Sequence, residues 1–205
     1  MPLVEVRLEH DDDAIPGDVD RFLREANRRI EEFQRESSVP GFVACDHERT
    51  YRVLRNVAAA QVTPGTLFCE WGSGFGVVAC LAAMLDFDAV GIEIEEALVA
   101  EAQKLARDFE LPVEFLHGSF IPQGGAVPAD LGEGFVWLNT EEADPDELAF
   151  DPNDFDVIFA YPWPDETDIT TALFQRFARN GALLVTYHEN GALRLRRKVA
   201  KKSRR

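Results

Sequence analysis

A chain of 205 residues, with 46% hydrophobic and 28% charged residues, has the composition of one ordinary globular domain. It contains no run of 18 apolar residues that could cross a membrane, and we expect no secretory signal in its first residues. The net charge of −16 disfavours broad contact with nucleic-acid phosphates, and the basic residues within 194–205 leave that partner only as a minor alternative. The three cysteines form no Cys-x-x-Cys pair, so we predict no metal site and a reducing, cytoplasmic location.

Residues 1–41 are predicted to form an extension that precedes the main domain. Residues 3–8 have the pattern of a short strand, and an acidic stretch with a proline then ends any regular element. Over residues 18–36, apolar side chains recur at helical spacing, which predicts an amphipathic helix without evident chemistry. A second helix is predicted over residues 46–60, with Asp46 as its N-cap.

From residue 67 onward, strands and helices alternate, which predicts an α/β fold with a doubly wound, mostly parallel sheet. The expected strands cover 67–71, 89–94, 111–117, 155–160 and 181–187, and the expected helices cover 75–85, 96–109 and 168–179. A final strand over 193–199 would leave the C-terminal edge of the sheet shortened, or rebuilt by that single strand. We place the main domain at 42–199 and a basic tail at 200–205.

Residues 121–154 are an insertion rich in glycine, proline and acids, at a place where such a sheet needs only a short helix. Residues 135–138 have the pattern of a strand within it. Long loops at the carboxyl edge of a sheet often cover sites. We therefore predict that this insertion forms a lid that faces the substrate; a solvent-exposed loop without contact to the substrate is an equally weighted alternative.

The strongest signal is a glycine loop, Gly72-x-Gly74-x-Gly76, between a buried strand and an apolar helix. Glycines accept positive φ and let a ligand approach the backbone, and N–H groups near a helix N-terminus favour a polar ligand. A dinucleotide-binding loop would have a third glycine in place of Val77. Glu70 lies at the end of the strand, two residues before the loop. A tight turn without a ligand is the structural alternative.

The next strand ends in an acid at the spacing expected for one crossover helix. Glu93 follows Gly72 by 21 residues, and an acid at this place can accept hydrogen bonds from both ribose hydroxyls of a nucleoside. The structural alternative is that Glu93 is only a solvent-exposed residue at the start of a helix. Together, Glu70, the glycine loop and Glu93 resemble motif I and the following strand of the class I S-adenosylmethionine (SAM) dependent methyltransferases, and the resemblance covers about residues 42–190.

The resemblance implies SAM as the cofactor and suggests which residues contact it. Glu70 is expected near the methionine end, and Gly72, Ser73, Gly74, Gly76 and Glu93 are expected to contact the cofactor.

The remaining cofactor contacts are less closely specified by the resemblance. Many relatives carry an adenine-binding acid after the third strand, where this chain has Ser119 and Phe120, a hydrogen-bonding hydroxyl and a ring that could pack on adenine. Tyr51 follows a segment similar to one in some protein-lysine methyltransferases, and it is expected either to contact the cofactor or to lie in the core.

The loop after the fourth strand, Tyr161-Pro-Trp163-Pro-Asp165-Glu166, occupies the place of motif IV in this family. It departs from the Asp/Asn-Pro-Pro-aromatic form of enzymes that methylate base amines, so we do not infer a nucleic-acid amine as substrate. Tyr161 and Trp163 are predicted to offer aromatic faces to a cation, and Asp165 and Glu166 to orient an amine or take its proton. The structural alternative is that Trp163 packs on the core while the acids cap the next helix.

These patterns predict SAM-dependent methyl transfer to a small molecule or a protein side chain, with a lysine amine slightly favoured. A SAM-binding module without catalysis is the first alternative, because the adenine acid is missing and motif IV is altered. An NAD-dependent oxidoreductase is the second, and Val77 disfavours it.

Overall fold

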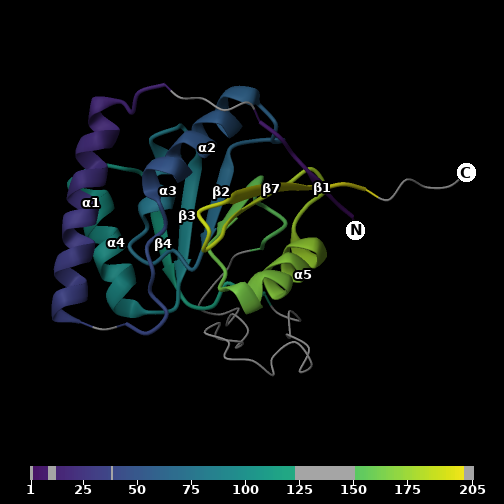
Figure 1. The fold of residues 1–205 in the computed structure, drawn as a ribbon. Helices are drawn as coiled ribbons and strands as arrows, with labels where there is room; N and C mark the ends of the chain where they lie inside the picture. Colours follow the sequence, from purple (N-terminus) through teal and green to yellow (C-terminus); the bar gives the residue numbers. More distant parts are fainter. Residues whose placement is uncertain (1, 9–12, 38, 123–150, 201–205) are drawn as a thin grey trace, which may run out of the picture.

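In the computed structural model, residues 2–8, 13–37, 39–122 and 151–200 are described. They form one sheet of seven strands with the order β1-β7-β6-β5-β2-β3-β4 and helices on both faces (Figure 1). The elements are β1 (Leu3–Glu5), α1 (Gly17–Glu36), α2 (His47–Ala60), β2 (Leu67–Trp71), α3 (Val77–Ala83), β3 (Asp88–Glu93), α4 (Glu96–Asp108), β4 (Glu114–His117), β5 (Val157–Ala160), η2 (Pro164–Glu166), α5 (Thr167–Phe177), β6 (Leu183–Tyr187) and β7 (Leu193–Lys198). The predicted α/β fold with a mostly parallel sheet is confirmed.

The N-terminal helices form for the local reasons that their sequences indicate. The buried stripe of α1 follows helical spacing and consists of Val19, Phe22, Leu23, Ala26 and Ile30. On its polar side, Arg28 pairs with Glu32 and Arg29 pairs with Glu25. Asp46 caps α2 as predicted, because its carboxylate accepts a hydrogen bond of 2.9 Å from the backbone N–H of Arg49.

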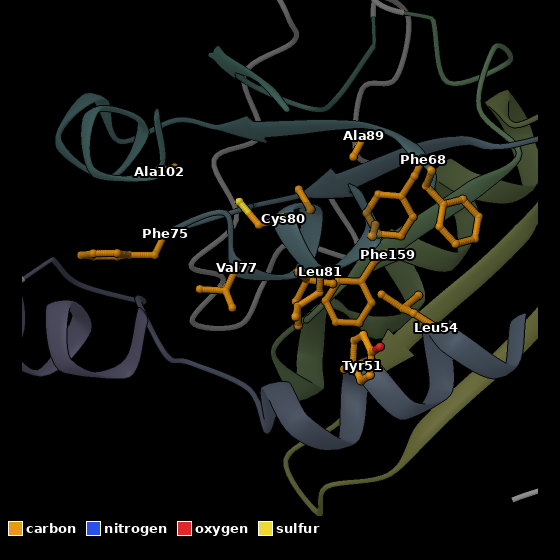
Figure 2. Packing of buried hydrophobic residues seen from close by; sticks show 14 of the residues in the cluster. Tyr51, Leu54, Phe68, Phe75, Val77, Cys80, Leu81, Ala89, Ala102 and Phe159 are labelled. Carbon is orange, nitrogen blue, oxygen red and sulfur yellow. The ribbon is translucent and has the colours of Figure 1, made fainter. Parts of the chain in front are cut away.

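Alternating side chains of the central strands supply two apolar cores, one on each face of the sheet. Helices α1 to α4 pack on one face, and α5 packs on the other (Figure 1). In the first core, Leu54 and Tyr51 of α2 lie near Phe159 of β5, with Leu81 of α3 beside them (Figure 2). This packing holds the carboxyl ends of the neighbouring strands β2, β3 and β5 side by side at one end of the sheet.

The far edge of the sheet differs from the expected shortened edge. β7 is antiparallel to β6, and β1 then adds to β7 in antiparallel register, with Leu3 opposite Lys198. Two further backbone hydrogen bonds, from Val6 to Leu195 and from Val199 to Pro2, extend this pairing. The predicted N-terminal strand thus completes the sheet at seven strands, because β1 presents free backbone groups to the otherwise unpaired edge of β7.

Some sequence predictions fall on residues outside the described part of the chain. Most of the predicted lid at 121–154, its strand at 135–138, and all but the first residue of the predicted tail at 200–205 lie there. Within the described residues, no helix is both long and apolar enough to cross a membrane.

Candidate active site

A cavity of about 300 Å³ opens at the carboxyl ends of β2, β3 and β5. The glycine loop and the end of β3 form one wall, and the loop after β5 with the start of α5 forms the opposite wall. Residues 39–45, which precede α2, and His47, the first residue of α2, line a third side. This position is the edge at which α/β sheets bind their ligands.

The backbone N–H groups of the glycine loop are largely used within the protein. Those of Gly72 and Ser73 both donate to the carbonyl of Ile92 at 2.9 Å. The N–H of Gly74 donates to Glu93, and that of Gly76 donates to the carbonyl of Ser73. These four N–H groups therefore bind the loop to β3 and to itself, and they are not free to donate to a polar ligand.

The three loop glycines have different structural roles, although all have positive φ. A Cβ atom on Gly72 would meet nothing within 4 Å, and this residue lines the cavity, so a ligand has room against its backbone. A Cβ on Gly74 would lie 2.7 Å from the ring of Phe42. A Cβ on Gly76 would lie 2.2 Å from the ring of Phe115, so Gly76 permits α3 to pack against β4 and lies behind the cavity wall.

Glu93 ends β3 and is held in the cavity wall by three backbone N–H groups. One carboxylate oxygen accepts from Gly74 at 2.7 Å, and the other accepts from Ile94 at 2.8 Å and Glu95 at 2.9 Å. Burial raises the pKa of this carboxyl, and the three hydrogen bonds oppose that shift. A carboxylate has about four lone-pair sites, so acceptor capacity remains for a ligand hydroxyl.

Glu70 is the second-to-last residue of β2 and links the sheet to the glycine-loop helix. Its carboxylate accepts a hydrogen bond of 2.8 Å from the N–H of Ala79 in the first turn of α3, and the side chain is only 5% exposed. Burial raises the pKa of the Glu70 carboxyl well above its ordinary value. Glu70 therefore anchors α3 and also contributes a carboxyl group to the cavity wall.

Ser73 lines the same wall with a hydroxyl that lacks a protein partner. The side chain is 6% exposed, and its Oγ makes no hydrogen bond. Because an unsatisfied buried hydroxyl is costly, this atom indicates a ligand group at the glycine loop.

Ser119 and Phe120 lie together on the β4 side of the cavity. The Ser119 hydroxyl accepts a hydrogen bond of 3.1 Å from the N–H of Ile121. The Phe120 ring is nearly parallel to that of Trp71, with a centroid distance of 5.1 Å. Phe120 thus offers an aromatic surface that is already supported by a second ring.

The loop after β5 places two aromatic residues and one acid at the opposite wall. Tyr161 and Trp163 line the cavity, and Tyr161 packs edge-on against Tyr187 with a centroid distance of 4.8 Å. Asp165 is exposed and lies outside the wall, whereas Glu166 is buried within it. The Glu166 carboxylate also accepts a hydrogen bond of 3.3 Å from the backbone N–H of Trp163, which fixes the loop.

Tyr51 lies away from the cavity. It is buried in the core on the inner side of α2 (Figure 2) and is 3% exposed, so its position gives no support to a cofactor contact. Sequence reasoning missed His47 and Glu189, which do line the cavity. Burial lowers the pKa of His47 to about 4, so the imidazole is neutral at pH 7.

No protein-family model matches the sequence, and no curated protein matches it either. Solved structures do match. An RNA methyltransferase from Salinibacter ruber, in complex with S-adenosyl-L-homocysteine, is 18% identical with a TM-score of 0.52, over 80% of this chain and 97% of the other. An O-methyltransferase from Bacillus cereus, also in complex with this compound, is 14% identical with a TM-score of 0.51, over 84% of this chain and 66% of the other.

The chain has the class I methyltransferase fold. The fold predicted from the glycine loop and the strand-end acid is therefore confirmed.

Within this methyltransferase fold, the charged side chains of the cavity are almost all acidic. Among the described residues that line it, five are glutamates, namely Glu70, Glu93, Glu95, Glu166 and Glu189, and none is lysine or arginine. Such a wall favours a cationic ligand and repels phosphates. Nor does any group of three or more His, Cys, Asp or Glu in the described part of the chain have the geometry to hold a metal ion.

Proposed function

We propose that the protein is a SAM-dependent methyltransferase whose acceptor nucleophile is an amine, on a small molecule or a protein side chain. The observation that carries this proposal is the cavity wall of five glutamates without a lysine or arginine among the described lining residues. SAM has a sulfonium and an ammonium group, and amines are cationic before they react. A wall of carboxylates suits both partners.

The residues on the glycine-loop side fit a SAM molecule. The remaining acceptor site of the Glu93 carboxylate suits a ribose hydroxyl, and the open space at Gly72 lets a ligand reach the backbone. The buried Ser73 hydroxyl would gain a partner, and the Phe120 ring would pack on adenine. Both solved methyltransferases described above contain S-adenosyl-L-homocysteine, the product form of this cofactor.

A nicotinamide dinucleotide is the less suitable ligand. Its pyrophosphate needs free N–H groups in the glycine loop, and those of Gly72, Ser73, Gly74 and Gly76 already donate within the protein. Its two negative charges would also lie in a cavity lined by Glu95, Glu166 and Glu189 and by no lysine or arginine among the described residues.

SAM supplies an electrophilic methyl group on its sulfonium when bound. The residues of the opposite wall would prepare the acceptor: the faces of Tyr161 and Trp163 hold the amine, and a carboxylate oxygen of Glu166 accepts its proton. Residues 39–45 cover the cavity and limit the access of water. The chain would thus contribute mainly positioning and a matched electrostatic environment.

The proposal extends to the arrangement and location of the protein. Residues 42–199 would form the methyltransferase domain and residues 1–41 its extension, which supplies β1 and α1. Cys45, Cys69 and Cys80 are all free thiols, which is consistent with a reducing, cytoplasmic location.

Calorimetric titration of the full chain with SAM, S-adenosyl-L-homocysteine and NAD tests the cofactor. We expect micromolar binding of the two adenosyl-sulfur compounds and none of NAD; tighter binding of NAD would overturn the proposal. Transfer of a tritiated methyl group to a panel of amines and matched alcohols then tests the acceptor. SAM binding without transfer to any amine would instead support a non-catalytic SAM-binding module.

A further inference from the structure

Two arginines and a histidine cluster where the β6–β7 hairpin faces α5. His188 follows β6, and Arg194 and Arg196 lie on alternate positions of β7, opposite Thr186 and Leu184 in the register. Thr186 and His188 are bonded to each other at 2.9 Å. Arg196 reaches across to α5, where its Nη2 donates to the Thr171 hydroxyl at 3.0 Å.

The charges of this basic cluster are poorly compensated. Within the described residues, neither Arg194 nor Arg196 forms an ion pair with an acid, and the buried Nε of Arg196 has no hydrogen-bond partner. Burial and the two arginines lower the pKa of His188, while burial and Arg194 lower that of Arg196. Asp168 favours the charged form of Arg196 without forming an ion pair with it.

The basic cluster is linked to the cavity wall along the chain at two places. His188 is the chain neighbour of Glu189, which lines the cavity mouth. Thr171, the partner of Arg196, is the chain neighbour of Thr170, which lines the cavity beside Glu166. His188, Arg194 and Arg196 do not line the cavity themselves; the cluster is connected to it through these neighbouring residues of the chain.

We infer that His188, Arg194 and Arg196 bind an anionic group, a phosphate or a carboxylate, on the acceptor whose amine lies in the cavity. This inference rests on the proposed function for the acceptor. The cavity wall and the basic cluster have opposite charge, so they fit an acceptor with a cationic amine at one end and an anion at the other. Arginine has a fork of donors that matches both phosphate and carboxylate oxygens.

The arrangement also has a direct consequence for His188. The two arginines disfavour the imidazolium form, and a bound anion would oppose them and favour it. Anion binding should therefore raise the pKa of His188.

The test uses inorganic phosphate and acetate as probes of the full chain. Each is titrated at constant ionic strength against a sodium chloride reference, while NMR follows the His188 imidazole signals, assigned with His188→Gln. We expect a saturable shift with phosphate or acetate and a higher pKa for His188 in its presence. The stronger of the two probes identifies the anion as a phosphate or a carboxylate.

Arg194 is exposed, so Arg194→Gln should leave the fold intact and weaken probe binding by about fivefold or more. Arg107→Gln, an exposed arginine of α4, is the matched control and should leave binding unchanged. Equal shifts in chloride, or an unchanged response in Arg194→Gln, would overturn the inference.

A SAM titration of the same samples separates this inference from the proposed function. Phosphate bound at the basic cluster should leave SAM affinity unchanged, and competition between them would place the anion in the cavity and overturn the inference. If the wild-type protein does not bind SAM but its His188 signals still respond to the anion, the proposed function is refuted and this inference is not.

Discussion

The two sides of the cavity are built in different ways. On the side of β2 and β3, backbone N–H groups hold the carboxylates of Glu70 and Glu93, which are almost completely buried. On the side of β5 and α5, the wall consists of side chains from separate segments, and Tyr161, Trp163 and Glu189 are partly or fully exposed. Backbone geometry therefore determines the first side, whereas packing between distant segments determines the second.

The largest effect should come from the backbone-built side. Gly76→Ala would place a methyl group against the Phe115 ring at a positive φ, so we expect a loss of about 3 kcal/mol in the free energy of unfolding. Gly17→Ala is the control, because a Cβ there meets nothing within 4 Å, and it should be neutral or slightly stabilising. Urea unfolding of both variants measures this; equal stability would mean that Gly76 is not required for packing.

On the β5 side of the cavity, substitutions of the adjacent acids Asp165 and Glu166 should have different effects, because only Glu166 lines the cavity. Glu166→Gln should lower methyl transfer to an accepted amine by about 100-fold and change SAM affinity by less than about twofold, since Glu166 faces the acceptor half of the cavity. Asp165→Asn should change neither quantity, because Asp165 is exposed outside the wall. The same loss in both variants would assign the effect to the conformation of the loop.

A substitution at Glu93 tests the side of the cavity that is proposed to bind SAM, independently of the acceptor side. Glu93→Ala removes the acceptor for ribose hydroxyls and should weaken SAM binding at least about tenfold, equivalent to about 1.4 kcal/mol. Glu96→Ala, three residues away and outside the cavity wall, should bind as the wild type does. Calorimetry measures both affinities, and an unchanged affinity for Glu93→Ala would remove the ribose assignment.

The smallest effect concerns the pH dependence of stability. Because the pKa of Glu70 is raised on folding, its contribution to stability is fully present below the unfolded-state pKa of about 4.3 and is lost as pH rises through the folded-state pKa. Glu70→Gln keeps an acceptor for the Ala79 N–H without this titration, so its stability should fall less over that range. Thermal unfolding between pH 4 and pH 8 compares the two proteins, and parallel curves would contradict the raised pKa.

The same contrast explains which parts the sequence could predict. Helix and strand positions followed from apolar periodicity, and the glycine loop with Glu93 followed from spacing, because both depend on local backbone geometry. The sequence did not distinguish Asp165 from Glu166, since the short turn η2 decides which of two adjacent acids points inward. Nor did the sequence decide whether Tyr51 lies in the core or contacts the cofactor, because the inward face of α2 can pack against either.

The position of β1 has a consequence for the order in which the protein folds. Its partner β7 is the last of the described strands, so this pairing closes the longest loop between paired strands and must wait until β7 has been synthesised. The five parallel strands can assemble before that step, whereas the outer edge of β7 stays unpaired until β1 joins it. We therefore expect β1 to dock late during folding and to detach early during local unfolding, as hydrogen exchange at Leu3–Glu5 would reveal.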